Sequence, residues 1–202
     1  MAHEGLWEQL EKLNGAETAR RAKCQYLSNP DRYIVVMLNT EYIINLSNRQ
    51  IFSTKPEIQE RAADFLEQLC LLAYLINAKE LPLANKLVKA QTFPGGQFFF
   101  RGQHKLPTVK LKNIFGSNPE VLYEILPQFE AKKCEYGDAS IEINVLPRIP
   151  LTIVIWKSDE EFGARASILF DKTTAYQIPL DALLIIVNLT IKALEKAVNV
   201  TK

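Results

Sequence analysis

The chain has 202 residues, of which 48% are hydrophobic and 23% charged, and its formal net charge is +1. Basic and acidic side chains nearly balance, so there is no overall field to hold a polyanion, which argues against general nucleic-acid binding. The length predicts a single domain over residues 1–202 with a sizeable core. Because neither a signal peptide nor an apolar stretch long enough for a membrane span is predicted, we expect a soluble, cytoplasmic protein.

The first part of the chain combines helical periodicity with short strands. Runs rich in Ile, Val and Tyr alternate with Asn-Thr and Ser-Asn-Arg turns, which indicates a β-meander. A longer stretch then places apolar residues at helical spacing. The predicted elements are two short helices between residues 6 and 26, a meander near 32–53, and a helix near 56–78 capped by Ser53 or Thr54.

The second part begins with an irregular pattern and ends with strands and a helix. Its predicted elements are an irregular segment near 82–112 with a Pro-Gly-Gly turn and a strand at 97–101, a helix near 118–130 capped by Ser117 or Asn118, a meander near 141–170, and a closing helix near 179–198. The strands are grouped rather than alternating with helices. This order indicates an α+β fold with two antiparallel β-meanders and packing helices.

The three cysteines predict neither a disulfide framework nor a metal site. Cys24, Cys70 and Cys134 are odd in number, far apart and without a C-x-x-C spacing. Cys70 stands among leucines, so we predict a buried thiol that packs as a small hydrophobic group.

The second half contains the most specific pattern in the chain, a P-x-x-P followed by W-x-x-D-x-E-F and I-L-F-D. It consists of Pro147, Pro150, Trp156, Asp159, Glu161, Phe162, Ile168, Leu169, Phe170 and Asp171. With the L-L-A-Y-L-I run before the irregular segment, it resembles an uncharacterised bacterial and archaeal family, number 3786 in the domain-of-unknown-function series. The resemblance runs nearly end to end and implies an anaerobic metabolic setting without an established activity.

The same resemblance leaves the cofactor unknown. Some relatives carry an added Cys-rich iron–sulfur module, and this chain has no such module among its three cysteines. A role linked to a cluster or a corrinoid is therefore context that the resemblance implies, and it assigns no site here.

Three acids at residues 159–161 stand between two apolar runs, just after Trp156. Carboxylates held close together raise one another's pKa, so Asp159 and Glu161 could act as general acid and base, or bind a hard cation through oxygen. The alternative is a solvated connection between strands at 151–157 and 165–170. The residues alone favour the solvated connection over a carboxylate site. The family-like W-x-x-D-x-E-F order makes the two interpretations more nearly equal.

Two further positions have both a structural and a functional interpretation. We predict that the Asp171 carboxylate accepts N–H bonds from Thr173 or Thr174. The alternative is that Asp171 is a second carboxylate that faces Asp159 or Glu161, if the two strand ends meet. His104 has no second histidine or cysteine nearby, which is typical of a loop residue. It nevertheless lies in a segment with glycines and cations that could hold an anion: Gly95, Gly96, Gly102, Arg101, Lys105, Lys110 and Lys112.

We expect an accessory protein that binds a small molecule or a protein partner, rather than an enzyme. Its pocket would lie between the irregular segment and the sheet around Trp156. The predicted ligand-binding residues are Arg101, His104, Trp156, Asp159, Glu161 and Asp171. Two alternatives stay open: an enzyme using Asp159, Glu161 and His104 as acid and base or with a metal, and a structural interaction module. No metal ligands are assigned.

Overall fold

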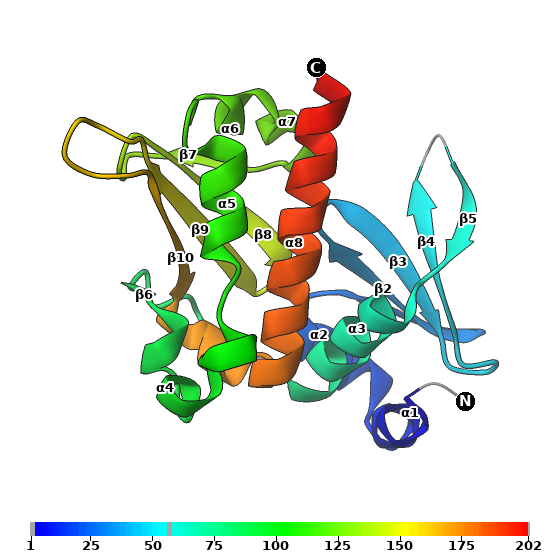
Figure 1. Cartoon of the computed structure of the whole chain (residues 1–202). Coiled ribbons are helices and arrows are strands. Elements are labelled where there is room, and N and C mark those ends of the chain that lie inside the picture. Colours follow the sequence, from blue (N-terminus) through cyan, green and yellow to red (C-terminus); the bar gives the residue numbers. More distant parts are fainter. Residues whose placement is uncertain (1–2, 56–57, 202) are drawn as a thin grey trace.

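The computed structural model describes residues 3–55 and 58–201, which form two antiparallel sheets with helices between and beside them (Figure 1). This is the predicted α+β class. The first sheet has its strands in sequential order: β1 Gln25–Ser28, β2 Asp31–Met37, β3 Thr40–Asn45, β4 Gln50–Lys55 and β5 Ile58–Ala62. The second sheet has the order β6-β10-β9-β8-β7, with β6 Leu87–Val88, β7 Lys132–Cys134, β8 Ala139–Leu146, β9 Ile149–Trp156 and β10 Arg165–Asp171. The central strands of both sheets confirm the two predicted meanders, whereas the short flanking strands were not predicted.

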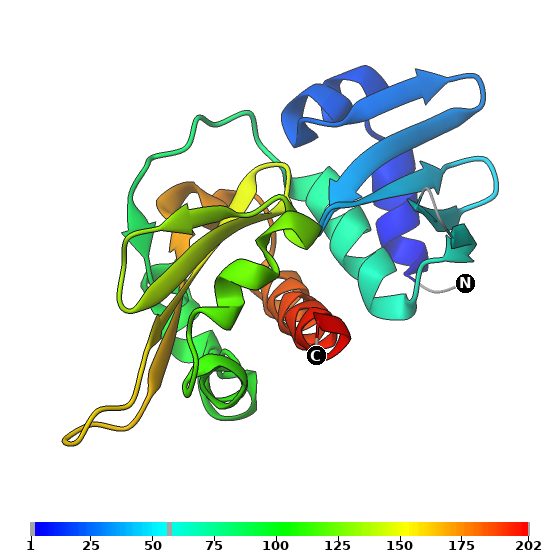
Figure 2. The same cartoon turned by 90° about the horizontal axis from the view of Figure 1, so that it is seen from above.

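The long C-terminal helix α8, Leu180–Thr201, packs against α3, Phe65–Asn77, and α5, Thr108–Phe115. Seen from above, its C-terminal end lies between the two sheets (Figure 2). The N-terminal helices α1 Glu4–Glu11 and α2 Gly15–Ala22 confirm the two predicted short helices, and both contact α3. Helix α3 also packs against α8, and one hydrophobic core contains side chains from both sheets. This continuity supports the single-domain organisation, which stays a prediction.

A backbone hydrogen bond joins the two sheets directly. The N–H of Leu38, in the turn between β2 and β3, donates to the Val145 carbonyl oxygen of β8 at 3.2 Å. The neighbouring Asn39 side chain donates to the Gln128 carbonyl oxygen at 3.2 Å. The β2–β3 turn therefore fixes where the first sheet meets the second.

The helix expected near 56–78 is wrong in its first part. Residues 58–62 form β5, which pairs with β4, and the helix begins at Phe65. Its N-cap is Asp64, which with Glu67 forms a capping box, so neither Ser53 nor Thr54 caps it. Pairing with β4 outweighs the local helical pattern. Pro56 and Glu57 lie outside the described residues.

The helix expected near 118–130 is divided into two single turns. These are α6, Val121–Glu124, and α7, Leu126–Phe129, with Pro127 in the first turn of the second. Proline lacks a backbone N–H, so a continuous helix would lose a hydrogen bond at this point. No side chain caps α6, so the expected cap at Ser117 or Asn118 is not observed.

The segment near 82–112 is irregular for much of its length but holds short helical turns. After β6 it contains the 3-10 turns η1, Ala90–Thr92, and η2, Gly102–His104, the helix α4, Gly96–Phe99, and the start of α5, Thr108–Phe115. The strand expected at 97–101 is therefore wrong. Gly95 adopts φ +75° at the start of α4, a conformation that suits glycine and turns the chain into the helix.

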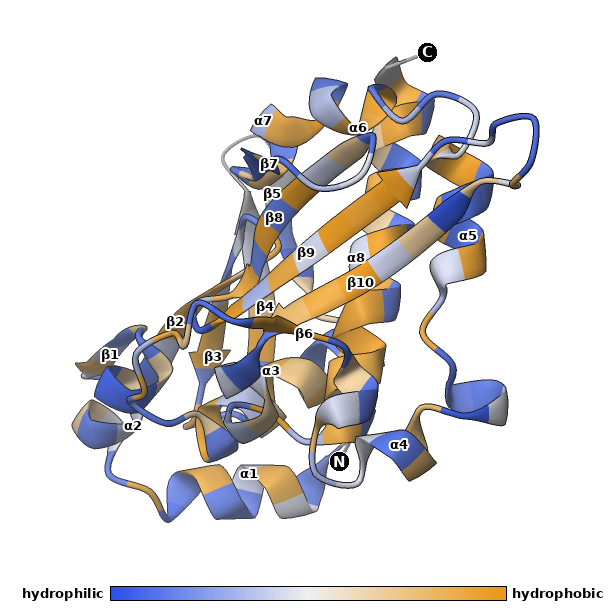
Figure 3. Cartoon of the chain, turned by 90° about the vertical axis from the view of Figure 1, so that its left-hand side faces the viewer, coloured by the Kyte–Doolittle hydropathy of each residue, from blue (hydrophilic) through white to orange (hydrophobic). Residues whose placement is uncertain are grey.

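Two predictions about the core are confirmed. Every residue of β9 before Trp156 is buried, as expected of a central strand, and Figure 3 shows the strand as mostly hydrophobic. The Cys70 thiol is buried in α3 and donates to the Ala182 carbonyl oxygen of α8 at 3.6 Å. Burial raises the pKa of this thiol, so it stays protonated and packs as a hydrophobic group. In the described part of the chain, no helix is long and apolar enough to cross a membrane.

Candidate functional site

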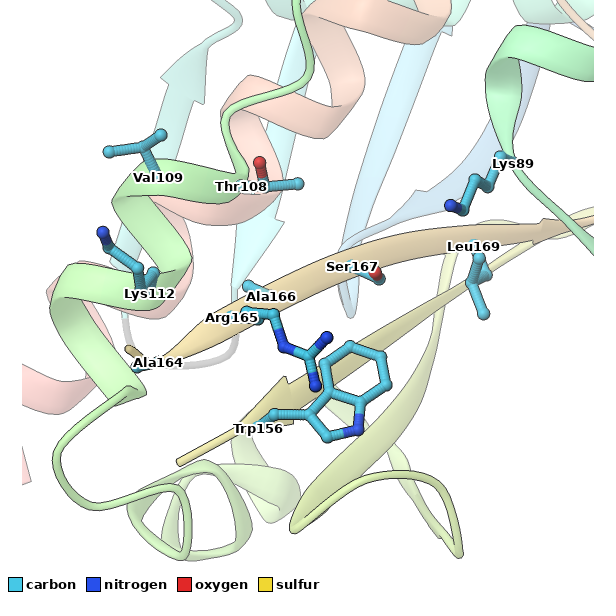
Figure 4. Close-up of a pocket in the computed structure, with 10 residues that line it drawn as sticks. All are labelled: Lys89, Thr108, Val109, Lys112, Trp156, Ala164, Arg165, Ala166, Ser167 and Leu169. Carbon is cyan, nitrogen blue, oxygen red and sulfur yellow. The ribbon is translucent and has the colours of Figure 1, made fainter. Parts of the chain in front are cut away.

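A hollow of about 610 Å³ lies beside the outer edge of β10, next to α5 (Figure 4). Strand β10 pairs with β9 from Arg165 to Phe170, but its pairs with β6 are limited to Phe170 and Asp171. In the described residues, the earlier part of β10 therefore has a strand partner on one side only. Helix α5 contacts β10 and β9, and the hollow occupies the space left along this edge. We call it the α5–β10 hollow; its lining residues are Lys89, Thr108, Val109, Lys112, Trp156, Ala164, Arg165, Ala166, Ser167 and Leu169.

Three cationic side chains line the α5–β10 hollow. Lys89 follows β6, Lys112 belongs to α5, and Arg165 begins β10. The described lining contains no carboxylate, and the hydroxyl groups of Thr108 and Ser167 add hydrogen-bonding capacity. Like charges gathered around a concave surface raise the local positive potential, so the site favours a negatively charged ligand.

Trp156 forms an aromatic wall of the hollow. It is the cross-strand partner of Arg165, whose guanidinium carbon lies 5.5 Å from the centroid of the indole ring. Strand alternation directs Ile155 into the core, where it is 0% exposed, and Trp156 toward the opposite face. The indole is half-buried rather than part of the core, and it is the predicted ligand-binding residue that the hollow includes.

The structure does not bring Arg101 and His104 to this wall. Helix α4 and the segment that follows it lie near the lower end of the molecule in Figure 1, whereas the loop between β9 and β10 extends from the upper end. The His104 ring stacks on Phe99 at a centroid distance of 4.7 Å, and the Arg101 guanidinium lies over the Phe98 ring. Both residues are exposed and outside the lining of the hollow.

The acids at residues 159–161 lie in an exposed loop that is held by its own backbone. Asp159 Oδ1 accepts the N–H groups of Glu161 and Phe162 at 2.9 and 2.6 Å. The Asp159 N–H donates to the Phe162 carbonyl oxygen at 2.9 Å. This geometry is that of the solvated connection. Within residues 3–55 and 58–201, no group of three or more His, Cys, Asp and Glu side chains could hold a metal ion.

Asp171 is 3% exposed and anchors two separate segments. Its Oδ1 accepts the N–H and the hydroxyl of Thr173 at 2.8 and 2.6 Å, which confirms the predicted turn. The N–H groups of Ala84 and Lys86 also donate to this carboxylate, at 3.1 and 3.3 Å. Burial by itself raises the pKa of Asp171, but these hydrogen bonds outweigh it and lower the pKa.

The carboxylates of the predicted set do not converge. Asp159 precedes β10 and Asp171 ends it, and a seven-residue strand separates its two ends by about 20 Å. The open possibility that Asp171 faces Asp159 or Glu161 is therefore excluded by the strand between them.

Lys89, Thr108, Arg165 and Ser167 line the hollow without having been singled out from the sequence. A signal for two of them was present, because Arg165 and Ser167 alternate on the β10 face opposite Ala166. Lys112 belonged to the segment of glycines and cations, and the structure places it at the hollow while leaving Arg101 and Lys105 elsewhere.

One protein-family model matches most of the chain. The model described as "Domain of unknown function (DUF3786)" matches residues 14–193, a range that includes both sheets and the α5–β10 hollow. No curated protein and no solved structure matches the chain. Because the match spans far more than half of the 202 residues, the chain belongs to the DUF3786 family, as the W-x-x-D-x-E-F and I-L-F-D motifs indicated.

Proposed function

We propose that this protein is a non-catalytic accessory protein that binds a small anionic ligand in the α5–β10 hollow. Lys89, Lys112 and Arg165 carry this proposal, because all three line one hollow whose described lining has no carboxylate. The volume of about 610 Å³ is within the range of small-molecule sites, roughly 300–1,000 Å³. The proposal includes a cytoplasmic location, the anaerobic metabolic setting that the family resemblance implies, and no general nucleic-acid binding.

The lining indicates the chemical class of the ligand. Guanidinium and ammonium groups form charge-assisted hydrogen bonds with phosphate and carboxylate oxygens. The indole of Trp156 provides a flat apolar surface next to Arg165. A ring that carries a phosphate or carboxylate group would use both features, with the hydroxyls of Thr108 and Ser167 orienting its polar end.

Binding is favoured over catalysis by where the predicted acid–base residues lie. Asp159 holds the turn of its own loop, and His104 packs on Phe99 away from the hollow. The described lining has no His, Cys, Asp or Glu side chain. The positive charge of this hollow would attract and hold an anion, while the described lining places no carboxylate, imidazole or thiol beside it as a general base.

A fluorescence titration with matched ligands tests the proposal. Phenyl phosphate and phenol share a ring and differ in charge, and excitation near the red edge of tryptophan absorption reports on Trp156. The other tryptophan, Trp7, is 0% exposed in the core and gives a constant background. We expect a saturable change with phenyl phosphate that is lost in Trp156→Phe, and at most a weak, unsaturated change with phenol.

Two lysines of α5 provide a matched pair of variants. Lys112 lines the hollow, whereas Lys110 is exposed on the same helix and outside the lining. We expect Lys112→Gln to weaken phenyl phosphate binding roughly fivefold to tenfold, and Lys110→Gln to change it less than about twofold. Equal affinities in these two variants, or equal binding of phenol, would overturn the proposal.

A further inference from the structure

A second hollow, of about 670 Å³, lies between the first sheet and the C-terminal half of α8. We call it the α8 cleft. One wall consists of side chains at the ends of β2, β3 and β4, including Thr40 and Tyr42. The other wall consists of Phe129 from α7 and of Leu189 and later residues of α8. The cleft therefore lies between the first sheet on one side and helices α7 and α8 on the other. It shares no lining residue with the α5–β10 hollow.

The two carboxylates in the lining of the α8 cleft are already engaged. Glu67 Oε1 accepts from the Tyr42 hydroxyl at 2.8 Å, and both Glu67 oxygens accept from the Arg61 guanidinium at 2.7 and 2.9 Å. The Asp64 N–H donates to Glu67, and Asp64 Oδ1 in turn accepts two N–H groups at the start of α3. Burial raises the pKa of Glu67, but these donors outweigh it and lower the pKa. Glu67 is thus a charged, internally paired group.

The lysines of the cleft differ from these acids. Lys192 and Lys196 are one turn apart on α8, both are exposed, and neither pairs with a carboxylate of the described chain. On the same face of α8, Leu189, Ala193 and Val200 form an apolar strip, and Val200 is 76% exposed. The described lining therefore carries more cations than carboxylates, and Lys192 and Lys196 stand beside its apolar surface.

We infer that the α8 cleft binds an amphiphilic anion, a small molecule with an apolar body and one carboxylate or phosphate group. The apolar body lies against Phe129, Leu189 and Ala193, and the charged group lies at Lys192 and Lys196. Charge complementarity selects this class, because Arg61 pairs with Glu67 and backbone N–H groups hold Asp64, so that Lys192 and Lys196 are the cations of the lining without a carboxylate partner. The site is independent of the proposed function of the α5–β10 hollow.

An NMR titration of the full chain with decanoate and decan-1-ol tests this inference. The two probes have the same chain length and differ in charge. We expect decanoate to shift backbone amide signals of α8 from Leu189 onward and of the β3 residues Thr40 and Tyr42. Amides of α5 and β10 should move less, because they border the other hollow. Decan-1-ol should bind roughly fivefold to tenfold more weakly.

Variants locate the charge requirement. The double substitution Lys192→Gln/Lys196→Gln removes both ammonium groups, and Lys105→Gln/Lys110→Gln removes the same charge from exposed sites outside either hollow. We expect the first pair to weaken decanoate binding about tenfold and the second to leave it within about twofold. All four positions are exposed, so thermal unfolding midpoints close to that of the native chain should verify that the variants fold.

Three outcomes would overturn the inference. The first is equal affinity for decanoate and decan-1-ol, which would remove the role of charge. The second is unchanged decanoate affinity in Lys192→Gln/Lys196→Gln, or shifts confined to the α5–β10 hollow. The third is a concentration-dependent dimer that shifts the same α8 amides without any probe, which would assign the cleft to a second copy of the chain.

Discussion

The two ends of β10 place an aspartate in opposite environments. Asp159, in the loop before the strand, accepts N–H groups from residues two and three positions ahead and is exposed. Asp171, at the end of the strand, makes a similar local turn but also accepts N–H groups from residues 84 and 86, far away in the sequence. The comparison shows when an aspartate turn contributes most to stability: when N–H groups from distant residues also donate to the carboxylate and water is excluded from it.

Removal of the Asp171 carboxylate should have the largest effect. Asp171→Ala leaves the N–H groups of Ala84 and Lys86 and the Thr173 hydroxyl without their acceptor in a buried place. We expect the free energy of unfolding to fall by about 3 kcal/mol, measured by urea denaturation. Asp171→Asn keeps one acceptor oxygen and should cost about 1–2 kcal/mol. A loss below about 0.5 kcal/mol in the alanine variant would contradict the anchoring role.

The same carboxylate should make stability depend on acid pH. The pKa of Asp171 is lowered in the folded state, whereas an unfolded aspartate titrates near about 3.9. Its contribution is therefore fully present above that value and is lost as the pH falls toward the folded pKa. We expect the difference in unfolding free energy between the native chain and Asp171→Asn to shrink as the pH falls from 5 to 2. This interval brackets the range of roughly 2–4 in which such carboxyl groups titrate. A difference that stays constant over this interval would be incompatible with the lowered pKa.

Removal of the Asp159 carboxylate should have a smaller effect, because this residue lies in the exposed loop before β10. Asp159→Ala removes a turn that only Glu161 and Phe162 complete, and water can replace those contacts. We expect the free energy of unfolding to decrease by less than about 1 kcal/mol. A loss as large as that of Asp171→Ala would show that the loop contributes to the core. Urea denaturation of both variants in the same buffer gives the direct comparison.

The smallest effect is expected for Glu160 and Glu161. Both are exposed and neither lines the α5–β10 hollow. The double substitution Glu160→Gln/Glu161→Gln should change the free energy of unfolding by less than about 0.5 kcal/mol. It should also leave phenyl phosphate affinity within about twofold, because these acids are outside the lining. A tenfold change in phenyl phosphate affinity would show that the acidic loop takes part in ligand binding.

The parts of the fold that could be predicted are those with a strong local signal. The apolar run of β9 and the alternation in β8 indicated strands, and the position of Cys70 among leucines indicated a buried thiol. The first boundary error arose where strand pairing outweighs the local helical pattern. Pairing with β4 makes residues 58–62 a strand, although the residues around them continue a helical pattern.

The candidate site shows the same division. Counting from Ile155 placed Trp156 on the opposite face of the strand, but it did not predict that the indole is only half-buried, and the neighbours of Trp156 could not be identified this way. Lys89 and Lys112 are on different elements from Arg165, and each alone is typical of an exposed basic residue. Their meeting depends on α5 lying beside an edge of β10 that β6 covers only at its end.

The sequence by itself determined the family, the α+β class, the central strands and the turn at Asp171, because periodicity, turn chemistry and short motifs act over a few residues. The tertiary structure alone decided that the acids do not converge, that cations gather at the α5–β10 hollow, and that Lys192 and Lys196 border a cleft. These outcomes depend on which strand edges and helix faces meet. That is set by packing between distant segments, and no local pattern encodes it.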